Sequence, residues 1–529
     1  MGLSALFHFL LLSSLVFPAA PAISPQLLGA ISFQPAGFLS LYRYMSDSTE
    51  KYGLLISSPE TSVGPSGATT STSRVAVVTD IGSKLNNLAG VTPDIVNTDV
   101  IWPNVVSKVP DEVLGGADQY IVIPNGFVDP DRRSGALVMQ PLKGGDASVI
   151  TPTTSEWFYN KVQWVDMNKD GTLDALTCRA RRSQSSGLQS GINDPYGQYM
   201  PAYYNPPQQY GSPQQFGYLG QNGPVGQYDP SGQYNDPSGQ YNDPSGQSGM
   251  PPPSDPLGVL GPYPPPNMYA PSQQISLDSV SRFGTFEGEL VWYSNPQDHS
   301  LDSLWAENFV NPGPDVFFTH TKFDVGGSEK EVIITAEYFR SQFRVFWTES
   351  PNQDWSNPSL VRSRDIDRAV GTPALPGLPF GVEVHDVNKD GKDDIVLSLN
   401  DPANGGIYVY EVPDDFRTGT FTRHVIANGF SEIKALHTAG SPALFAFLPS
   451  QDSSQKPSIV VAGGDSCDLT ILEPVNPTDP RDWTYWKKEI LQTALSSVEG
   501  VQVADVDGDG RYEIFATAYE FGAVYVWTV

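Results

Sequence analysis

The amino-acid sequence predicts an all-β fold, a seven-bladed β-propeller, and three observations lead to it. Three short acidic loops, each flanked by runs of alternating apolar residues, begin at Asp166, Asp386 and Asp505. The last two loops start 119 residues apart, close to two units of about 60 residues. A similar apolar strand rich in aromatic residues also recurs once per unit. A period of this length with several short strands is typical of a propeller, whose closed ring leaves few sheet edges.

Steps of about 62 residues locate the other units of the repeat. They place weaker copies of the loop at Tyr42, Asn104 and Asp324, and a degenerate copy at 445–462. The strands expected to end the seven units begin, in order, at Ser73, Gly135, Gly288, Phe343, Gly406, Asp468 and Gly522. About 59 residues fall to each unit, which suits four strands per blade.

The chain is expected to divide into four segments. Residues 1–22 resemble a secretory signal peptide, because an apolar run is followed by the small residues Ala20, Pro21 and Ala22 at a cleavage site. Blades one, two and the first part of three occupy 23–183, an insertion occupies 184–274, and the rest of blade three to blade seven occupies 275–529. Because the last strand ends at Val529, the segment 23–38 is predicted to supply the strand that closes the ring. We therefore expect a secreted, extracellular protein.

The insertion at 184–274 lies within the third blade unit and contains no Lys or Arg. It is rich in Pro, Gly, Gln, Ser and Tyr, and the motif GQYNDPS occurs at Gly232 and again at Gly239. Such a composition buries too little apolar surface to offset the entropy of ordering the chain, so the segment is predicted to be disordered. Both an inert spacer and an adhesive or matrix-associating segment fit this composition.

The composition and net charge of the chain favour some classes of binding partner and disfavour others. The net charge of −28 argues against nucleic acid, whose phosphates an acidic surface repels, and favours cations or basic partners. No stretch after residue 22 is apolar and long enough to span a membrane. Cys178 and Cys467 are the only cysteines, and the sequence fits either a disulfide or two buried free thiols.

The acidic loops carry the pattern of a calcium site. Calcium takes six to eight oxygen ligands from carboxylates, amides and backbone carbonyls. Positions 1, 3, 5, 7 and 9 of each nine-residue loop can supply such ligands, and position 7 needs only its backbone carbonyl. The candidate ligands are Asp166, Asn168, Asp170, Thr172 and Asp174 in the first loop, Asp386, Asn388, Asp390, Lys392 and Asp394 in the second, and Asp505, Asp507, Asp509, Arg511 and Glu513 in the third.

Two other structures share parts of this loop pattern. An EF-hand requires a bidentate Glu at position 12 between two helices, but Thr177, Leu397 and Ala516 occupy that position and the flanks alternate as strands do. Three polar Asx turns that bind no ion form the other alternative.

The pattern D-x-[DN]-x-D-G-x-x-[DE] closely resembles the FG-GAP or VCBS repeat, which builds β-propellers such as the integrin α-subunit head. That resemblance covers the three loops and implies Ca²⁺ binding in each of them.

The function expected from these features is that of a secreted, calcium-binding scaffold for adhesion or matrix assembly, with an extracellular protein or glycan as ligand. A carbohydrate-active enzyme of the lyase or dehydratase type, or a lectin, using the central channel, is the alternative. His299, His320, His385, His424 and His437 have no zinc-like spacing, and no nucleophile motif is present. The recurring aromatic residues Trp292, Trp347, Tyr410 and Trp527 are expected to pack between blades, with a carbohydrate platform as the alternative.

Overall fold

The structure is a computed structural model of the 529-residue chain, and it forms two units. The first unit contains all the described residues, which are 23–63, 69–116, 119–127, 135–152, 156–182, 286–368, 377–433 and 440–529. The second unit, Ser185–Pro271, lies outside them, and so do the predicted signal peptide and the predicted insertion.

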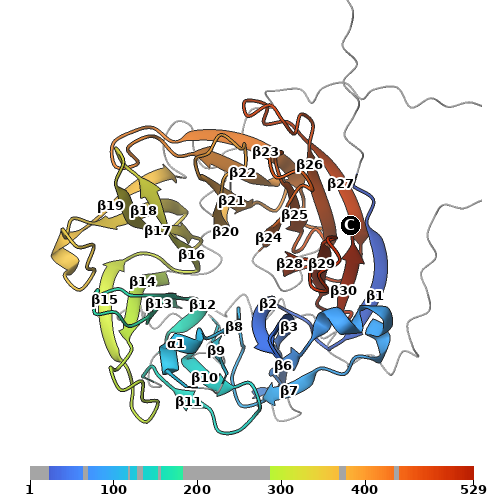
Figure 1. The fold of residues 1–529 in the computed structure, drawn as a ribbon, viewed down its shortest axis with the longest axis horizontal. Helices are drawn as coiled ribbons and strands as arrows, with labels where there is room; N and C mark the ends of the chain where they lie inside the picture. Colours follow the sequence, from blue (N-terminus) through green and yellow to red (C-terminus); the bar gives the residue numbers. More distant parts are fainter. Residues whose placement is uncertain are drawn as a thin grey trace, which may run out of the picture. The chain divides into compact units, whose positions relative to one another are not determined.

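Seven four-stranded antiparallel sheets follow one another around a ring, which confirms the predicted seven-bladed propeller (Figure 1). Within each sheet the strands are given from the innermost outward. Blade one consists of β2 (Leu39–Ser46), β3 (Thr49–Ser58), β6 (Arg74–Val78) and β7 (Asp94–Asn97), and blade two of β8 (Ser107–Lys108), β9 (Tyr120–Pro124), β10 (Leu137–Pro141) and β11 (Ser148–Val149). Blade three consists of β12 (Phe158–Val165), β13 (Asp174–Arg182), β14 (Phe286–Ser294) and β15 (Ala306–Pro312), and blade four of β16 (Phe317–Asp324), β17 (Glu329–Glu337), β18 (Gln342–Thr348) and β19 (Val361–Arg368).

The remaining blades and the few elements outside the blades complete the described chain. Blade five consists of β20 (Leu378–His385), β21 (Asp394–Asn400), β22 (Gly405–Glu411) and β23 (Thr422–Phe430). Blade six consists of β24 (Phe445–Leu448), β25 (Ser458–Ala462), β26 (Asp468–Pro474) and β27 (Tyr485–Gln492). Blade seven consists of β28 (Val501–Ala504), β29 (Glu513–Ala518), β30 (Ala523–Thr528) and β1 (Gln26–Ser32). The others are the hairpin β4 (Thr61–Val63) and β5 (Thr69–Ser71), and the short helices η1 (Ile81–Gly90), α1 (Asp111–Leu114) and η3 (Pro358–Leu360). No helix in these described ranges is long and apolar enough to cross a bilayer.

The hydrophobic core lies between neighbouring blades. Trp292 of blade three packs against Phe318 and Phe346 of blade four, and Trp527 of blade seven packs against Ile471 of blade six. Trp347, Tyr410 and the other predicted aromatic residues belong to the same kind of cluster. Large rings fill the space that widens between radial sheets. The prediction that these aromatic side chains pack between blades is therefore confirmed.

The N-terminal segment closes the ring, as predicted. β1 forms the outermost strand of blade seven and pairs antiparallel with β30, from Gln26 opposite Thr528 to Ser32 opposite Ala523. Ile31 of β1 is fully buried in a cluster that also contains Leu88 of η1, so the closing strand contacts both blade seven and blade one.

The strands predicted to end each unit are the third strands of the blades. In blades one to six a fourth, outermost strand follows in the chain, for example β27 after β26, whereas in blade seven that strand is β1. The outer strands were missed because most of their residues are exposed or half-buried, as in the sequence YWKKEILQ of β27. The first two weak loops were also misplaced: Tyr42 lies inside β2, and Asn104 precedes β8.

The insertion point in blade three is confirmed. β13 and β14 pair without a break from Ala175 opposite Tyr293 to Arg182 opposite Phe286, so the chain leaves and rejoins the sheet at adjacent points. Successive strands run in opposite directions. The end of β13 and the start of β14 therefore lie on the face of the ring opposite the loop that joins β12 to β13.

Candidate metal sites and the neighbouring cavity

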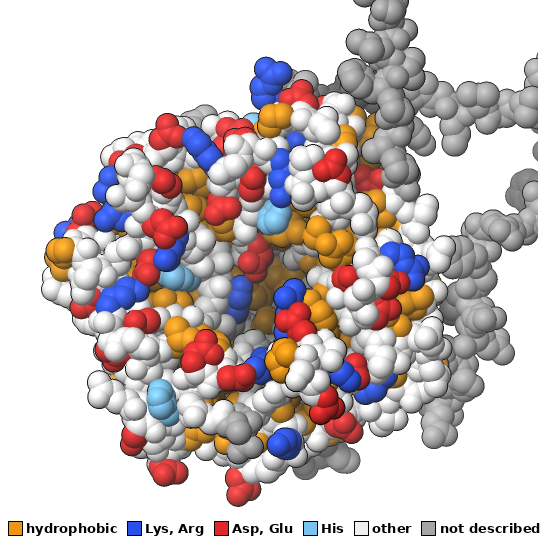
Figure 2. Space-filling view, viewed as in Figure 1, with side chains coloured by type: hydrophobic (Ala, Val, Ile, Leu, Met, Phe, Trp, Pro, Cys, Tyr) orange, Lys and Arg blue, Asp and Glu red, His pale blue; other side chains and the backbone are white. Residues whose placement is uncertain are grey.

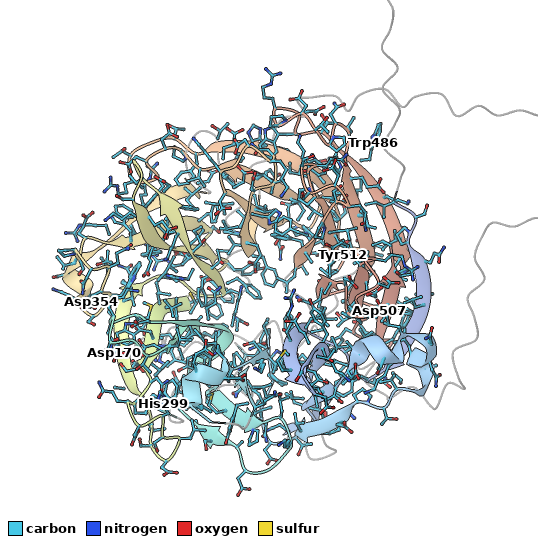
Figure 3. The ribbon with its side chains drawn as sticks, viewed as in Figure 1. Asp170, His299, Asp354, Trp486, Asp507 and Tyr512 are labelled. Carbon is cyan, nitrogen blue, oxygen red and sulfur yellow. The ribbon has the colours of Figure 1, made fainter. Side chains whose placement is uncertain are left out.

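The three acidic loops occupy equivalent places in blades three, five and seven. Each joins the innermost strand to the second strand of its blade, so all three lie on one face of the ring. Asp170 and Asp507 mark two of them and lie well apart around the ring (Figure 3). The structure therefore brings the predicted residues together within each loop and keeps the three loops separate.

The same hydrogen bonds shape all three turns. The Asp at position 1 accepts a bond of 3.1 Å from the backbone N–H of the Gly at position 6 in each loop. The Asp at position 5 accepts one of 2.8–2.9 Å from the N–H of position 7. The position 6 glycines Gly171, Gly391 and Gly510 have φ between 85° and 91°, which a residue with a Cβ adopts only under strain.

The carboxylate at position 9 is buried in every loop. Asp174, Asp394 and Glu513 are at most 2% exposed. Each accepts a backbone hydrogen bond of 3.0–3.1 Å from position 2, which pins the start of the second strand to the loop. Burial is the main cause that raises the pKa of Asp174 to about 6 and the pKa values of Asp394 and Glu513 to about 7, and the other loop carboxylates raise them further.

The loop of blade seven gathers its carboxylates most closely. One oxygen each of Asp505, Asp507 and Glu513 lies within 4.8 Å of the others. Among the described residues this is the one group of three or more acidic, His or Cys side chains with such spacing. In blade five, Oδ1 of Asp386 is buried without a hydrogen-bond partner, which leaves an oxygen free for a cation. These donor sets consist of oxygen atoms, which are the ligands that calcium prefers.

The other predicted ligands take part in bonds within the turns or point away. The amides of Asn168 and Asn388 donate to the position 5 carboxylates of Asp170 and Asp390. The guanidinium of Arg511 binds Asp509 at 2.7 Å. Lys392 pairs with Asp414, and the side chain of Thr172 interacts with the Asp170 carboxylate. The position 7 side chains are therefore engaged by carboxylates, and the backbone carbonyl of position 7 is the group left to bind a cation, as the sequence pattern predicts.

The loop of blade three is also tied to blade four. Nζ of Lys169, at position 4, lies 2.8 Å from Glu331 of β17 and donates to the backbone carbonyl of Asp166. Glu331 has its pKa lowered to about 2, because hydrogen bonds from Lys169 and the neighbouring His320 ring, whose Nε2 lies 3.7 Å away, stabilise the carboxylate by more than burial disfavours it. An ion pair between adjacent blades therefore supports this loop from outside.

A cavity of about 1080 Å³ lies beside the loop of blade seven. It opens between that loop and the β2–β3 hairpin of blade one, on the face that carries the acidic loops. Its charged and aromatic lining consists of Arg43, Glu50, Lys51, Tyr52, Asp80, Asp505, Asp507 and Tyr512. No local pattern in the sequence indicates that residues near 45 and residues near 505 meet, so the cavity was not predicted. The face viewed in Figure 2 carries acidic side chains interspersed with basic ones around the middle of the ring.

The charges that line the cavity are largely paired. Arg43 donates to the hydroxyl of Tyr52 at 2.8 Å, and Nζ of Lys51 lies 2.5 Å from Asp80. The carboxylates of the blade-seven loop, in contrast, face the cavity with hydrogen bonds only from their own turn. The lining carries two basic and four acidic side chains, so it favours a divalent cation at the loop.

Two of the described histidines stack on aromatic rings, and both cysteines are buried. His385 stacks on Phe447 at 4.4 Å, and His424 stacks on Trp483 at the same distance. None of the described histidines lines the cavity, and His437 lies outside the described residues. Cys178 and Cys467 are both buried and free, so the disulfide alternative is wrong.

The chain has the fold of known propellers at low sequence identity. No family model matches the chain, and no curated protein matches it. A structure of the Dos1 propeller has 8% identity and a TM-score of 0.37, covering 95% of both chains. A luciferin-regenerating enzyme has 8% identity and a TM-score of 0.33, covering 95% of this chain and 96% of that one. Rhamnogalacturonan lyase YesW has 8% identity and a TM-score of 0.30, covering 95% and 91%. The assignment of the propeller therefore depends on the seven sheets themselves.

Proposed function

We propose that this protein is a secreted, calcium-binding β-propeller that acts as an extracellular binding, adhesion or matrix scaffold. The observation that carries the proposal is the convergence of Asp505, Asp507 and Glu513 within 4.8 Å in a loop whose hydrogen bonds recur in two other blades. A lone acidic turn is common on protein surfaces, but three equivalent copies with a buried acid at position 9 indicate a shared ligand.

The role assigned to calcium is to neutralise carboxylates that repel one another. The ion would be held by the side chains at positions 1, 3, 5 and 9 and by the carbonyl at position 7. Because Asp174, Asp394 and Glu513 are buried, their ionised forms are costly in the absence of a cation. A bound cation offsets this cost and fixes the hairpin between the first two strands of its blade.

The cavity between blades one and seven is the proposed ligand site. Its floor includes two ligands of the proposed calcium ion, Asp505 and Asp507, so the ion would order the lining. The half-buried rings of Tyr52 and Tyr512 present an apolar face and a hydroxyl in the same cavity. This observation favours a glycan ligand as the second candidate beside an extracellular protein.

Calcium binding is tested by titrating CaCl₂ into the protein comprising residues 23–529, with calorimetric detection, and by thermal melting with and without chelator. We expect about three sites and a melting temperature that falls on chelation. A matched titration with MgCl₂ controls for unspecific charge neutralisation, since magnesium demands a tighter octahedral site. Absence of both heat and thermal shift would show that the loops are plain Asx turns.

A further inference from the structure

Ile23 is the first described residue, and it follows directly on the predicted cleavage site. Its backbone N lies 3.3 Å from Oε2 of Glu473 at the end of β26. Its carbonyl accepts a hydrogen bond from Nζ of Lys488 in β27. Its side chain packs on the cluster between blades six and seven that includes Ile490 and Val529. Ile23 is thus attached to blade six, whereas the strand that follows it completes blade seven.

The carboxylate of Glu473 has an unused oxygen. Its side chain is only 16% exposed, and Oε1 is buried with no hydrogen-bond partner. Nζ of Lys488 lies 3.9 Å from this oxygen, which is too far for a hydrogen bond. An amide nitrogen at Ile23 supplies a single N–H, which Oε2 already accepts. A buried acceptor without a donor is unfavourable, so the site is built for a nitrogen with more hydrogens.

We propose that cleavage of the Ala22–Ile23 peptide bond creates this donor and locks the ring. A signal peptidase uses water to hydrolyse the bond: the hydroxyl joins the carbonyl carbon of Ala22, which leaves as a carboxylate, and the nitrogen of Ile23 becomes an ammonium. The ammonium stands at the atom that already contacts Glu473, and its three hydrogens serve both carboxylate oxygens. The modification site is thus the new N-terminus, and its acceptor is Glu473.

The position of this ion pair gives it a structural consequence. β1 is an outermost strand that pairs along one edge only, with β30. Its residues Leu27 and Leu28 are 43% and 38% exposed, so burial contributes little at its start. Anchoring Ile23 to blade six therefore restrains the end of β1 at which fraying would begin. The inference rests on the proposed secretion of the protein, because secretion supplies the cleavage.

The test compares two chains that differ by one residue at the N-terminus. One begins at Ile23 and the other at Ala22, each released from a fusion by a protease that leaves no extra residue. The second chain keeps an amide at Ile23 and moves the ammonium one residue away. Each chain is also made with Glu473→Gln, which keeps an acceptor for the N–H but removes the charge. Glu329→Gln, at a 71% exposed side chain in blade four, is the control.

The readout is hydrogen exchange of the β1 amides, followed by mass spectrometry. We expect exchange about tenfold slower in the chain that begins at Ile23 than in the chain that begins at Ala22, because charge-assisted bonds resist local opening. The difference should vanish with Glu473→Gln and persist with Glu329→Gln. Equal exchange in the two unmutated chains, or a difference that survives Glu473→Gln, overturns the ion pair.

Secretion is tested separately, by intact mass of the protein recovered from the medium of a secreting host. A mass that begins at Ile23 supports the processing step, and a different first residue overturns it. Failure to reach the medium contradicts the proposed secretion, whereas the exchange experiment still tests the pairing with Glu473. The two failures are therefore distinguishable.

Discussion

Replacing Glu513 with Gln should shift stability in opposite directions with and without calcium. Oε2 of Glu513 accepts the N–H of Val506 at 3.1 Å, and a Gln oxygen can accept the same bond. The hydroxyl of Thr528 is buried near the Glu513 carboxyl without a hydrogen-bond partner of its own, so the substitution breaks no bond there. The substitution therefore keeps the turn and removes one charge from the proposed ligand set.

The magnitudes follow from burial and mass action. Burial chiefly raises the pKa of Glu513 from 4.5 to about 7, so its ionised form at pH 8 destabilises the folded state. A shift of that size corresponds to about 3 kcal/mol, and solvent at the open side of the loop reduces it to about 1–2 kcal/mol. Calcium at a thousand times its Kd contributes about 4.1 kcal/mol for one site. For a propeller of about 410 residues, 1 kcal/mol corresponds to about 1 °C.

The assay is thermal melting of the protein and of Glu513→Gln at pH 8, each in chelator and in excess calcium. In chelator the variant should melt about 1–2 °C higher, and in calcium about 2–3 °C lower. Glu329→Gln is the matched control, since Glu329 also begins the second strand of its blade but follows a loop without the acid ladder. If chelation lowers the melting temperature of Glu513→Gln as much as that of the unmutated protein, Glu513 is not a ligand.

Three more predictions address pH, the insertion and the cavity. The raised pKa values of Asp174, Asp394 and Glu513 mean that protonation favours the folded state. Lowering the pH from 8 to 5 should therefore reduce the rise in melting temperature that calcium causes, because protons then compete with the ion for these carboxylates. A rise in melting temperature that stays constant across this pH range contradicts the assignment. Deleting 184–274 should change the melting temperature by less than about 2 °C, because β13 and β14 pair directly and loop length costs little; a fall above about 5 °C would show that the insertion supports the ring. A Cβ at Gly82 would lie 2.2 Å from the carbonyl oxygen of Val506, so Gly82→Ala should displace the blade-seven loop. Calorimetry should then show an affinity for calcium about tenfold weaker at one site. The neighbouring substitution Ser83→Ala should leave the affinity of every site unchanged.

The sequence was sufficient to predict the ring because each unit repeats short-range features. The loop at Asp386 and the loop at Asp505 have the same spacing of acids and glycines, and their flanking strands alternate as strands do. Closure by the N-terminal segment was also predicted, since the last strand of blade seven ends at Val529. The repeat period was therefore enough to predict the number of blades even where individual copies of the acidic loop have diverged in sequence.

Features that arise between distant segments could not be predicted. The cavity joins Lys51 of blade one to Asp507 of blade seven, and neither residue lies in a pattern that points to the other. The outer strands escaped because solvent contact permits polar side chains there, as in β27. The loop of blade two was misplaced because the helix α1 replaces a tight turn between its first strands.

Closure by β1 also sets an order of events during synthesis. Gln26 leaves the ribosome early, but its partner Thr528 is made about 500 residues later, which takes about 25–100 s at ordinary elongation rates. Throughout that interval β1 lacks the strand that it pairs with in the ring, so the ring cannot close. β30 therefore completes the sheet of blade seven and joins it to the N-terminal strand in the same step, so deleting Ala523–Thr528 leaves both β1 and β29 without the strand they pair with.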